Sequence, residues 1–144
     1  MPVGAWVALA AVAVVAAFGG WRLVVDGRFR RHDVAAPAEP EPAGALAGTP
    51  WAAELGERAT LLQFSSAFCA PCRATRVVLA AVAHEEPGVR HVEVDAEQHL
   101  DVVRRLKVLR TPTTIVLDHA GRELGRAAGA PTREQVVRAL PAAR

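Results

Sequence analysis

Two cysteines, Cys69 and Cys72, are the residues of this chain whose type and spacing most directly suggest chemistry. They lie too close in sequence to staple a fold, so any use for them would be chemical. An apolar run at Thr60–Phe64, typical of a buried strand, ends shortly before them. A cysteine in the first turn of a helix has its thiolate stabilised by free backbone N–H groups and the helix dipole. Cys72, one helical turn later, could then resolve a mixed disulfide formed at Cys69.

Residues around the pair favour this interpretation over a metal site. Pro71 suits a first helical turn because it has no N–H to lose there, and Arg73 adds positive charge beside the pair. A zinc site would need a second cysteine pair or histidines at ligand spacing, and the five histidines are scattered. Inert core cysteines are a further alternative. We expect redox chemistry with no metal and no cofactor.

Short strands and helices alternate from Trp51 onward, and they must position the pair. Strands are predicted at 60–64, 89–95, 113–117 and 122–128, and helices at 69–84, 100–106 and 132–140. Thr132–Gln135 matches a capping box at the start of the last helix. The order β-α-β-α-β-β-α predicts an α/β fold, with a mixed central sheet between helices on both faces.

The N-terminal part is different in character. Val3–Trp21 contains no charged residue and, as a helix, would span roughly 28 Å, close to the hydrocarbon core of a bilayer. Val24 and Val25 can extend this helix. A cleaved signal peptide and a buried soluble helix are the alternatives, but no basic side chain precedes the run. We predict a single membrane-spanning helix within residues 1–25, with residues 3–25 as the membrane contact.

Charge predicts the orientation of this helix. Arg22, Arg28, Arg30 and Arg31 follow the apolar run against the single Asp26, which places residues 22 onward in the cytoplasm by the positive-inside rule. An extracytoplasmic domain, with the arginines bound to headgroups on that side, is the alternative. The net charge of the whole chain is only +2, which gives no electrostatic basis for binding nucleic acid.

The chain therefore divides into three predicted parts. Residues 1–25 form the membrane helix, 26–50 a basic juxtamembrane segment and linker, and 51–144 the globular domain. The linker contains four prolines among small and acidic residues over 32–50, which predicts an extended spacer.

The motifs carry a resemblance to a known family. The segment 64–73 (FSSAFCAPCR), together with 110–113 (RTPT), resembles thioredoxin and the thioredoxin-like proteins, and the similarity covers about 58–140. With its apolar helix, the chain resembles membrane-tethered thioredoxin-like proteins of bacteria. The positions that match the family motifs are Phe68, Cys69, Ala70, Pro71, Cys72, Arg73, Thr111 and Pro112.

This resemblance implies a thioredoxin-like three-layer fold and thiol–disulfide exchange on protein or small-thiol disulfides. It also implies that Pro112 is cis and lies beside the cysteines, and that the backbone of Thr111 binds substrate as an added strand.

Three positions depart from the family pattern. Thioredoxins have a buried Asp where this chain has Gln63, often a Lys where it has Glu93, and a Gly where it has Ala70. Gln63 cannot transfer a proton. Glu93 is either a possible proton acceptor for Cys72 or an ordinary solvent-facing residue of an alternating strand.

We predict a membrane-tethered thiol–disulfide oxidoreductase that acts as a disulfide reductase. The alternative is a redox-inactive thioredoxin-like module that binds proteins at the membrane. The sequence indicates neither the electron donor nor a particular substrate.

Overall fold

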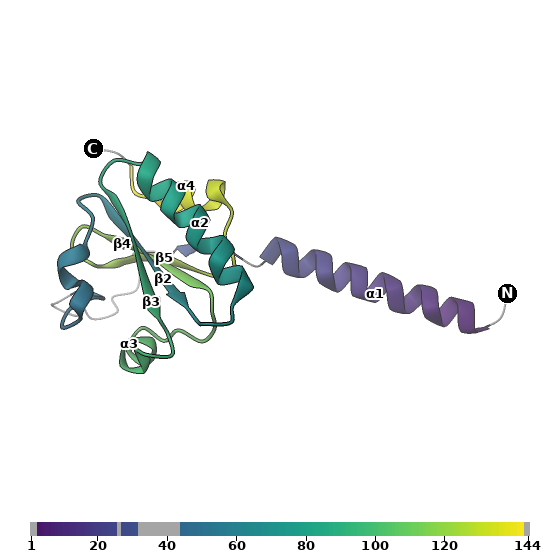
Figure 1. Cartoon of the computed structure of the whole chain (residues 1–144). Helices are drawn as coiled ribbons and strands as arrows, with labels where there is room; N and C mark the ends of the chain where they lie inside the picture. Colours follow the sequence, from purple (N-terminus) through teal and green to yellow (C-terminus); the bar gives the residue numbers. More distant parts are fainter. Residues whose placement is uncertain (1–2, 26, 32–43, 143–144) are drawn as a thin grey trace.

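The computed structural model describes residues 3–25, 27–31 and 44–142 (Figure 1). Its elements are α1 (Val3–Val25), β1 (Arg30–Arg31), the 3-10 helix η1 (Pro50–Glu54), β2 (Ala59–Ser65), α2 (Ala70–Glu85), β3 (Val89–Asp95), α3 (Leu100–Arg105), β4 (Thr113–Asp118), β5 (Glu123–Ala128) and α4 (Arg133–Ala139). Every strand and helix predicted from the sequence is present, with bounds shifted by at most a few residues. Strand β1 was not predicted.

The strands form one sheet in the order β1-β5-β4-β2-β3. Strands β2 and β3 are parallel, whereas the β2–β4, β4–β5 and β5–β1 pairs are antiparallel. Helices α2 and α4 cover one face, and α3 with η1 covers the other (Figure 1). The predicted α/β class, with a mixed sheet between two helical layers, is confirmed.

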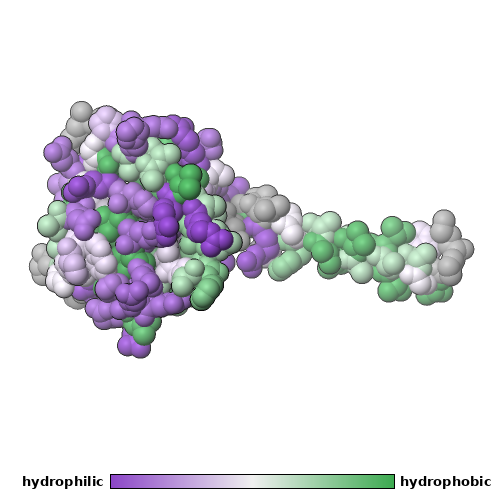
Figure 2. Space-filling view, in the orientation of Figure 1, coloured by the Kyte–Doolittle hydropathy of each residue, from purple (hydrophilic) through white to green (hydrophobic). Residues whose placement is uncertain are grey.

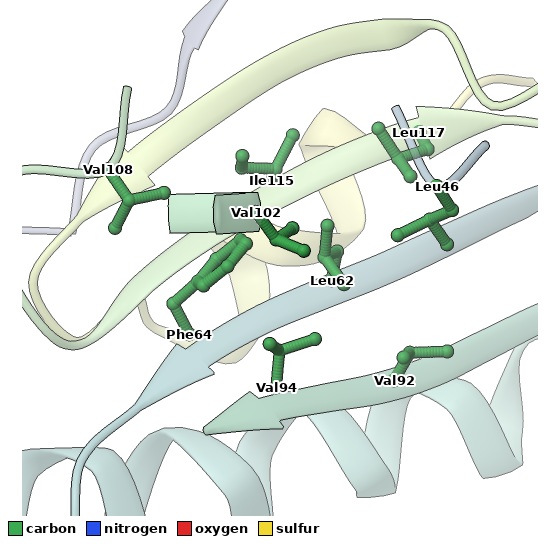
Figure 3. Packing of buried hydrophobic residues seen from close by; sticks show 9 residues of the cluster. All are labelled: Leu46, Leu62, Phe64, Val92, Val94, Val102, Val108, Ile115 and Leu117. Atoms are coloured by element: carbon green, nitrogen blue, oxygen red, sulfur yellow. The ribbon is translucent and has the colours of Figure 1, made fainter. Parts of the chain in front are cut away.

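Strand β2 is buried along its whole length because it is central in the sheet and covered on both faces. Its alternate side chains therefore enter two separate cores. Leu62 and Phe64 pack with Val102 of α3 on one face (Figure 3), whereas Leu61 packs with Leu79 of α2 on the other.

Helix α4 begins with the predicted capping box. The Thr132 hydroxyl accepts a hydrogen bond from the backbone N–H of Gln135, and the Gln135 side chain accepts one from the backbone N–H of Thr132. This reciprocal pair satisfies two backbone donors that the first turn leaves unpaired.

The packing extends into the segment that the sequence assigned to a linker. Arg30 and Arg31 pair with Arg126 and Gly125 of β5, and the core includes Leu46, which is only 1% exposed. The packed domain thus includes residues before 51. Sequence reasoning missed β1 because two arginines carry no strand signal. Their partner β5 lies about 95 positions away and would otherwise be an unpaired edge strand. Most of the predicted Pro-rich spacer, 32–43, lies outside the described residues.

Helix α1 is the one long apolar helix among the described residues. Its span Val3–Arg22 has a mean hydropathy of 2.1, and none of it is buried against the domain. Figure 2 shows hydrophobic side chains along the length of α1, whereas the domain surface is mixed and largely hydrophilic. By length and composition this helix could cross a membrane.

Candidate active site at the Cys69–Cys72 pair

The cysteine pair lies where β2 passes into α2. Cys69 is the N-cap of α2, and Pro71 occupies its first turn, as expected from the missing N–H. The two cysteines form a disulfide with an S–S distance of 2.05 Å. Cys69 is partly exposed, whereas Cys72 is 1% exposed. Of the two cysteines, only Cys69 can therefore attack another molecule or be attacked by one.

The start of α2 directs a backbone donor at the exposed sulfur. The N–H of Cys72 donates to Sγ of Cys69 at 3.1 Å. The same N–H lies 3.1 Å from the backbone oxygen of Cys69. Donors of this kind, with the positive end of the helix dipole, stabilise negative charge on sulfur when the disulfide is opened.

The loop before β4 lies against this turn. The Thr111–Pro112 peptide bond is cis, as the resemblance implies. The hydroxyls of Ser66 and Thr111 are 3.0 Å apart, so the two loops are in direct contact. The Thr113 hydroxyl donates to the Arg110 backbone oxygen at 2.7 Å, and the Pro112 oxygen accepts from the N–H of Gly129 at 2.8 Å.

A buried amide occupies the space behind Cys72. The Gln63 side chain is fully buried and donates from Nε2 to the backbone oxygen of Cys72 at 2.9 Å and to Oγ of Ser65 at 2.8 Å. Its Oε1 lies 3.0 Å from Nε2 of His91. Because an amide oxygen only accepts, His91 must donate from Nε2, which fixes its tautomer. Every polar atom of Gln63 is thereby paired.

The network continues to the surface through Glu93. Arg76 of α2 binds the Glu93 carboxylate, with Nε 2.6 Å from Oε2 and an NH2-to-Oε1 hydrogen bond of 2.8 Å. Burial alone would raise the pKa of Glu93, but hydrogen bonds from Arg76 and Ser65 and the charge of Arg76 outweigh it and lower that pKa. Burial lowers the pKa of His91, against the opposing charge of Glu93. At neutral pH the network therefore holds an ionised Glu93 and a neutral His91.

The structure brings most predicted site residues together and sets one apart. Phe68 is 100% exposed beside the pair, and Ala70, Pro71 and Arg73 are exposed on the first turn of α2. Thr111 contacts Ser66 in the loop before the pair, and Pro112 follows it in the same loop. Glu93 instead binds Arg76 and Ser65, and the side chain that contacts the backbone of Cys72 is Gln63.

Sequence reasoning missed His91 as a member of this site. Alternation along β3 places it on the same face as Glu93, and the parallel register pairs Gln63 with Glu93 and Leu61 with His91. That register was not readable from the sequence, although the alternation was.

Comparison with known proteins agrees with this geometry. The profile of the family described as Thioredoxin matches residues 45–142. The chain belongs to the thioredoxin family. Its thioredoxin domain, with the Cys69–Cys72 pair at the start of α2, is a thiol–disulfide oxidoreductase domain. Three of its curated relatives are eukaryotic, so the bacterial resemblance stays a prediction.

Individual relatives match about half of this chain. Thioredoxin of Echinococcus granulosus is 33% identical over 79 residues, which is 55% of this chain and 73% of that protein. Thioredoxin H2-1 of Oryza sativa is 32% identical over 51% of this chain and 53% of its own length. A human thioredoxin domain-containing protein 2 is 37% identical over 60 residues, but these are only 11% of that protein. Fasciola hepatica thioredoxin superposes with a TM-score of 0.52 at 27% identity, over 60% of this chain and 81% of that structure.

Proposed function

We propose that the whole protein is a membrane-anchored thiol–disulfide oxidoreductase that acts as a disulfide reductase. The observation that carries the proposal is the partly exposed Cys69 at the N-terminus of α2, bonded to the buried Cys72, in a chain that also has an exposed apolar helix.

The reaction begins from the dithiol form. The thiolate of Cys69 attacks a substrate disulfide, its sulfur bonds to one substrate sulfur, and the other leaves as a thiolate. The thiolate of Cys72 then attacks Sγ of Cys69 and expels the second substrate thiolate. The substrate gains two electrons, and the protein keeps the Cys69–Cys72 disulfide. A dithiol donor must then reduce the disulfide for another turnover.

Substrate would bind across the two loops that meet at Ser66 and Thr111. The Thr111 side chain contacts Ser66 in the loop before the pair, and Phe68 and Arg73 are exposed in the segment that carries the two cysteines. An extended substrate segment could pair with Thr111 as an added strand.

Cys72 needs a base when it attacks, and we propose Glu93 as that proton acceptor. The chain of contacts runs from the Cys72 carbonyl through Gln63 and Ser65 to Glu93. Gln63 and Ser65 hold this chain in place. We assign the proton from Cys72 to Glu93, the ionised carboxylate of the network; Gln63 and Ser65 position this group, and Gln63 relays no proton.

The decisive experiment compares single-cysteine variants of the full-length protein. Cys69→Ser should abolish reduction of a peptide disulfide. Cys72→Ser should accumulate a mixed disulfide, because the first attack proceeds and the release cannot. The two substitutions are matched in size and chemistry. Full activity of the Cys69→Ser protein would contradict the proposal.

Membrane attachment is proposed through residues 3–25, with the domain on the cytoplasmic side. Support comes from the hydropathy of α1 and from Arg22, Arg28, Arg30 and Arg31 beyond its end. A reducing compartment on that side would favour the reductase direction. Resistance to alkaline-carbonate extraction tests the attachment. Labelling of Cys69 by a membrane-impermeant maleimide in intact cells would place the domain outside.

A further inference from the structure

Strand β1 joins the helix α1 to the domain with almost no intervening chain. Helix α1 ends at Val25, and the N–H of Gly27 already donates to the backbone oxygen of Ala128 at the end of β5, at 3.0 Å. Two Cα–Cα steps limit the distance between Val25 and Gly27 to about 7.6 Å. The domain is therefore attached by a docked strand, and the predicted spacer follows that strand instead of preceding it.

The docking at Gly27 depends on glycine. Its φ is +79°, and a Cβ added there would lie 2.3 Å from the backbone oxygen of Ala130. The next residues continue the attachment: Phe29 packs against the core between the sheet and α2, and Arg30 pairs with Arg126. These contacts fix which end of the domain lies next to α1.

That end is the one that carries the cysteines. Each neighbouring pair in the order β1-β5-β4-β2 is antiparallel. The same end of the sheet therefore holds the first residues of β1 and β4 and the last residues of β5 and β2. Register connects them: Thr113 pairs with Ala128 on one side and with Phe64 on the other. Three strand spacings, roughly 15 Å, separate β1 from β2. Figure 1 shows α1 meeting the domain on the side where α2 begins.

The same end also exposes apolar and basic side chains. Phe68 is 100% exposed and Leu109 is 94% exposed, in the two loops that meet at the site. Arg28 and Arg30 are exposed on the segment that leads from α1. Exposed apolar and basic side chains at one end of the domain fit a position near an anionic bilayer surface. Exposed apolar groups at this end also suit an apolar juxtamembrane segment as partner.

We propose that the Cys69–Cys72 pair faces the bilayer and reduces disulfides in the juxtamembrane segments of other membrane proteins. This inference rests on the membrane attachment and the reductase activity proposed above. Because the docked strand attaches the domain to α1 by the end that carries the cysteines, we expect a disulfide carried far above the bilayer to lie away from the pair. The exchange is the one already written, with a dithiol donor restoring the pair.

The test places the full-length protein in lipid vesicles with two membrane-spanning peptide substrates. One carries a disulfide loop directly after its transmembrane helix. The other carries the same loop on a helical spacer of about 30 residues, roughly 45 Å from the bilayer. We expect the parent protein to reduce the near loop about tenfold faster, as expected when tethering sets the local concentration.

Two matched insertions separate tether length from other effects. Twelve Gly/Ser residues after Val25 free the domain and should abolish the preference. The same insertion after Pro40 lies between β1 and Leu46 and leaves the path from α1 to β1 unchanged. This variant should keep the preference for the near loop. Equal rates for both loops in the parent, or an unchanged preference after the Val25 insertion, would overturn the inference.

Separate measurements identify failure of the underlying function. Reduction of a soluble peptide disulfide in detergent reports the oxidoreductase activity and the folding of each variant, and carbonate extraction reports attachment. If both succeed and the preference is absent, the inference alone is wrong. If either fails, the proposed function is wrong.

Discussion

The buried amide of Gln63 should contribute measurably to stability. Its side chain is fully buried and takes part in three hydrogen bonds, with Cys72, Ser65 and His91. Replacement by leucine, of similar size, removes all three, at about 1 kcal/mol each. Better burial of the apolar side chain returns about 1 kcal/mol. We expect Gln63→Leu to lower the free energy of unfolding by about 2 kcal/mol, a factor of roughly 30 in the folding equilibrium.

The neighbouring position provides the matched control. Thr114 pairs with Gln63 in the sheet and is equally buried, but its hydroxyl makes no hydrogen bond among the described residues. Thr114→Val should therefore change stability by less than about 0.5 kcal/mol or increase it. The two substitutions remove polar groups at adjacent sites that differ in their hydrogen bonding.

Urea unfolding of the full-length protein in detergent, followed by circular dichroism, measures both effects. For a domain of this size, a loss of 2 kcal/mol lowers the midpoint by about 1 M. A Gln63→Leu midpoint equal to that of the parent would refute the reasoning. So would equal losses in the two variants, because the loss would then follow burial of a polar residue and not its bonds.

Three further predictions follow from the site and its attachment. The pKa of His91 is lowered in the folded state, mainly by burial, so stability is full above the unfolded pKa of about 6.5 and falls as pH drops below it. His91→Gln should reduce the difference in urea midpoint between pH 7.5 and 5.5, and an unchanged difference would exclude His91 as its source. Glu93→Gln keeps a hydrogen-bonding group but removes the proposed base, so release of the mixed disulfide should slow and lose its pH dependence while attack by Cys69 is unaffected; stopped-flow kinetics with equal slowing of both steps would argue for a structural role. Gly27→Ala places a Cβ against the Ala130 oxygen at a positive φ, so β1 should undock. Trypsin should then cleave after Arg28 and Arg30 roughly tenfold faster. The control Arg28→Lys, at the exposed neighbouring position, should be cleaved at the parental rate.

Local chemistry was predictable from short stretches of the sequence. The Cys-Ala-Pro-Cys segment between a strand and a helix, the capping box at Thr132 and the apolar run from Val3 are each written in a few consecutive residues. Period and capping govern such elements, and neither depends on distant partners. The two functional cysteines were predictable for the same reason.

Contacts between distant segments were decided only by the tertiary structure. The parallel register of β2 and β3 placed His91 and Gln63 together behind Cys72, and a one-residue slip would have turned both away. Pairing of Arg30–Arg31 with β5 depends on an open sheet edge formed by residues about 95 positions later. By itself, the sequence determined that this chain carries a redox pair and an apolar helix. Only folding decided that both lie at the same end of the domain, because strand direction and order are properties of the assembled sheet.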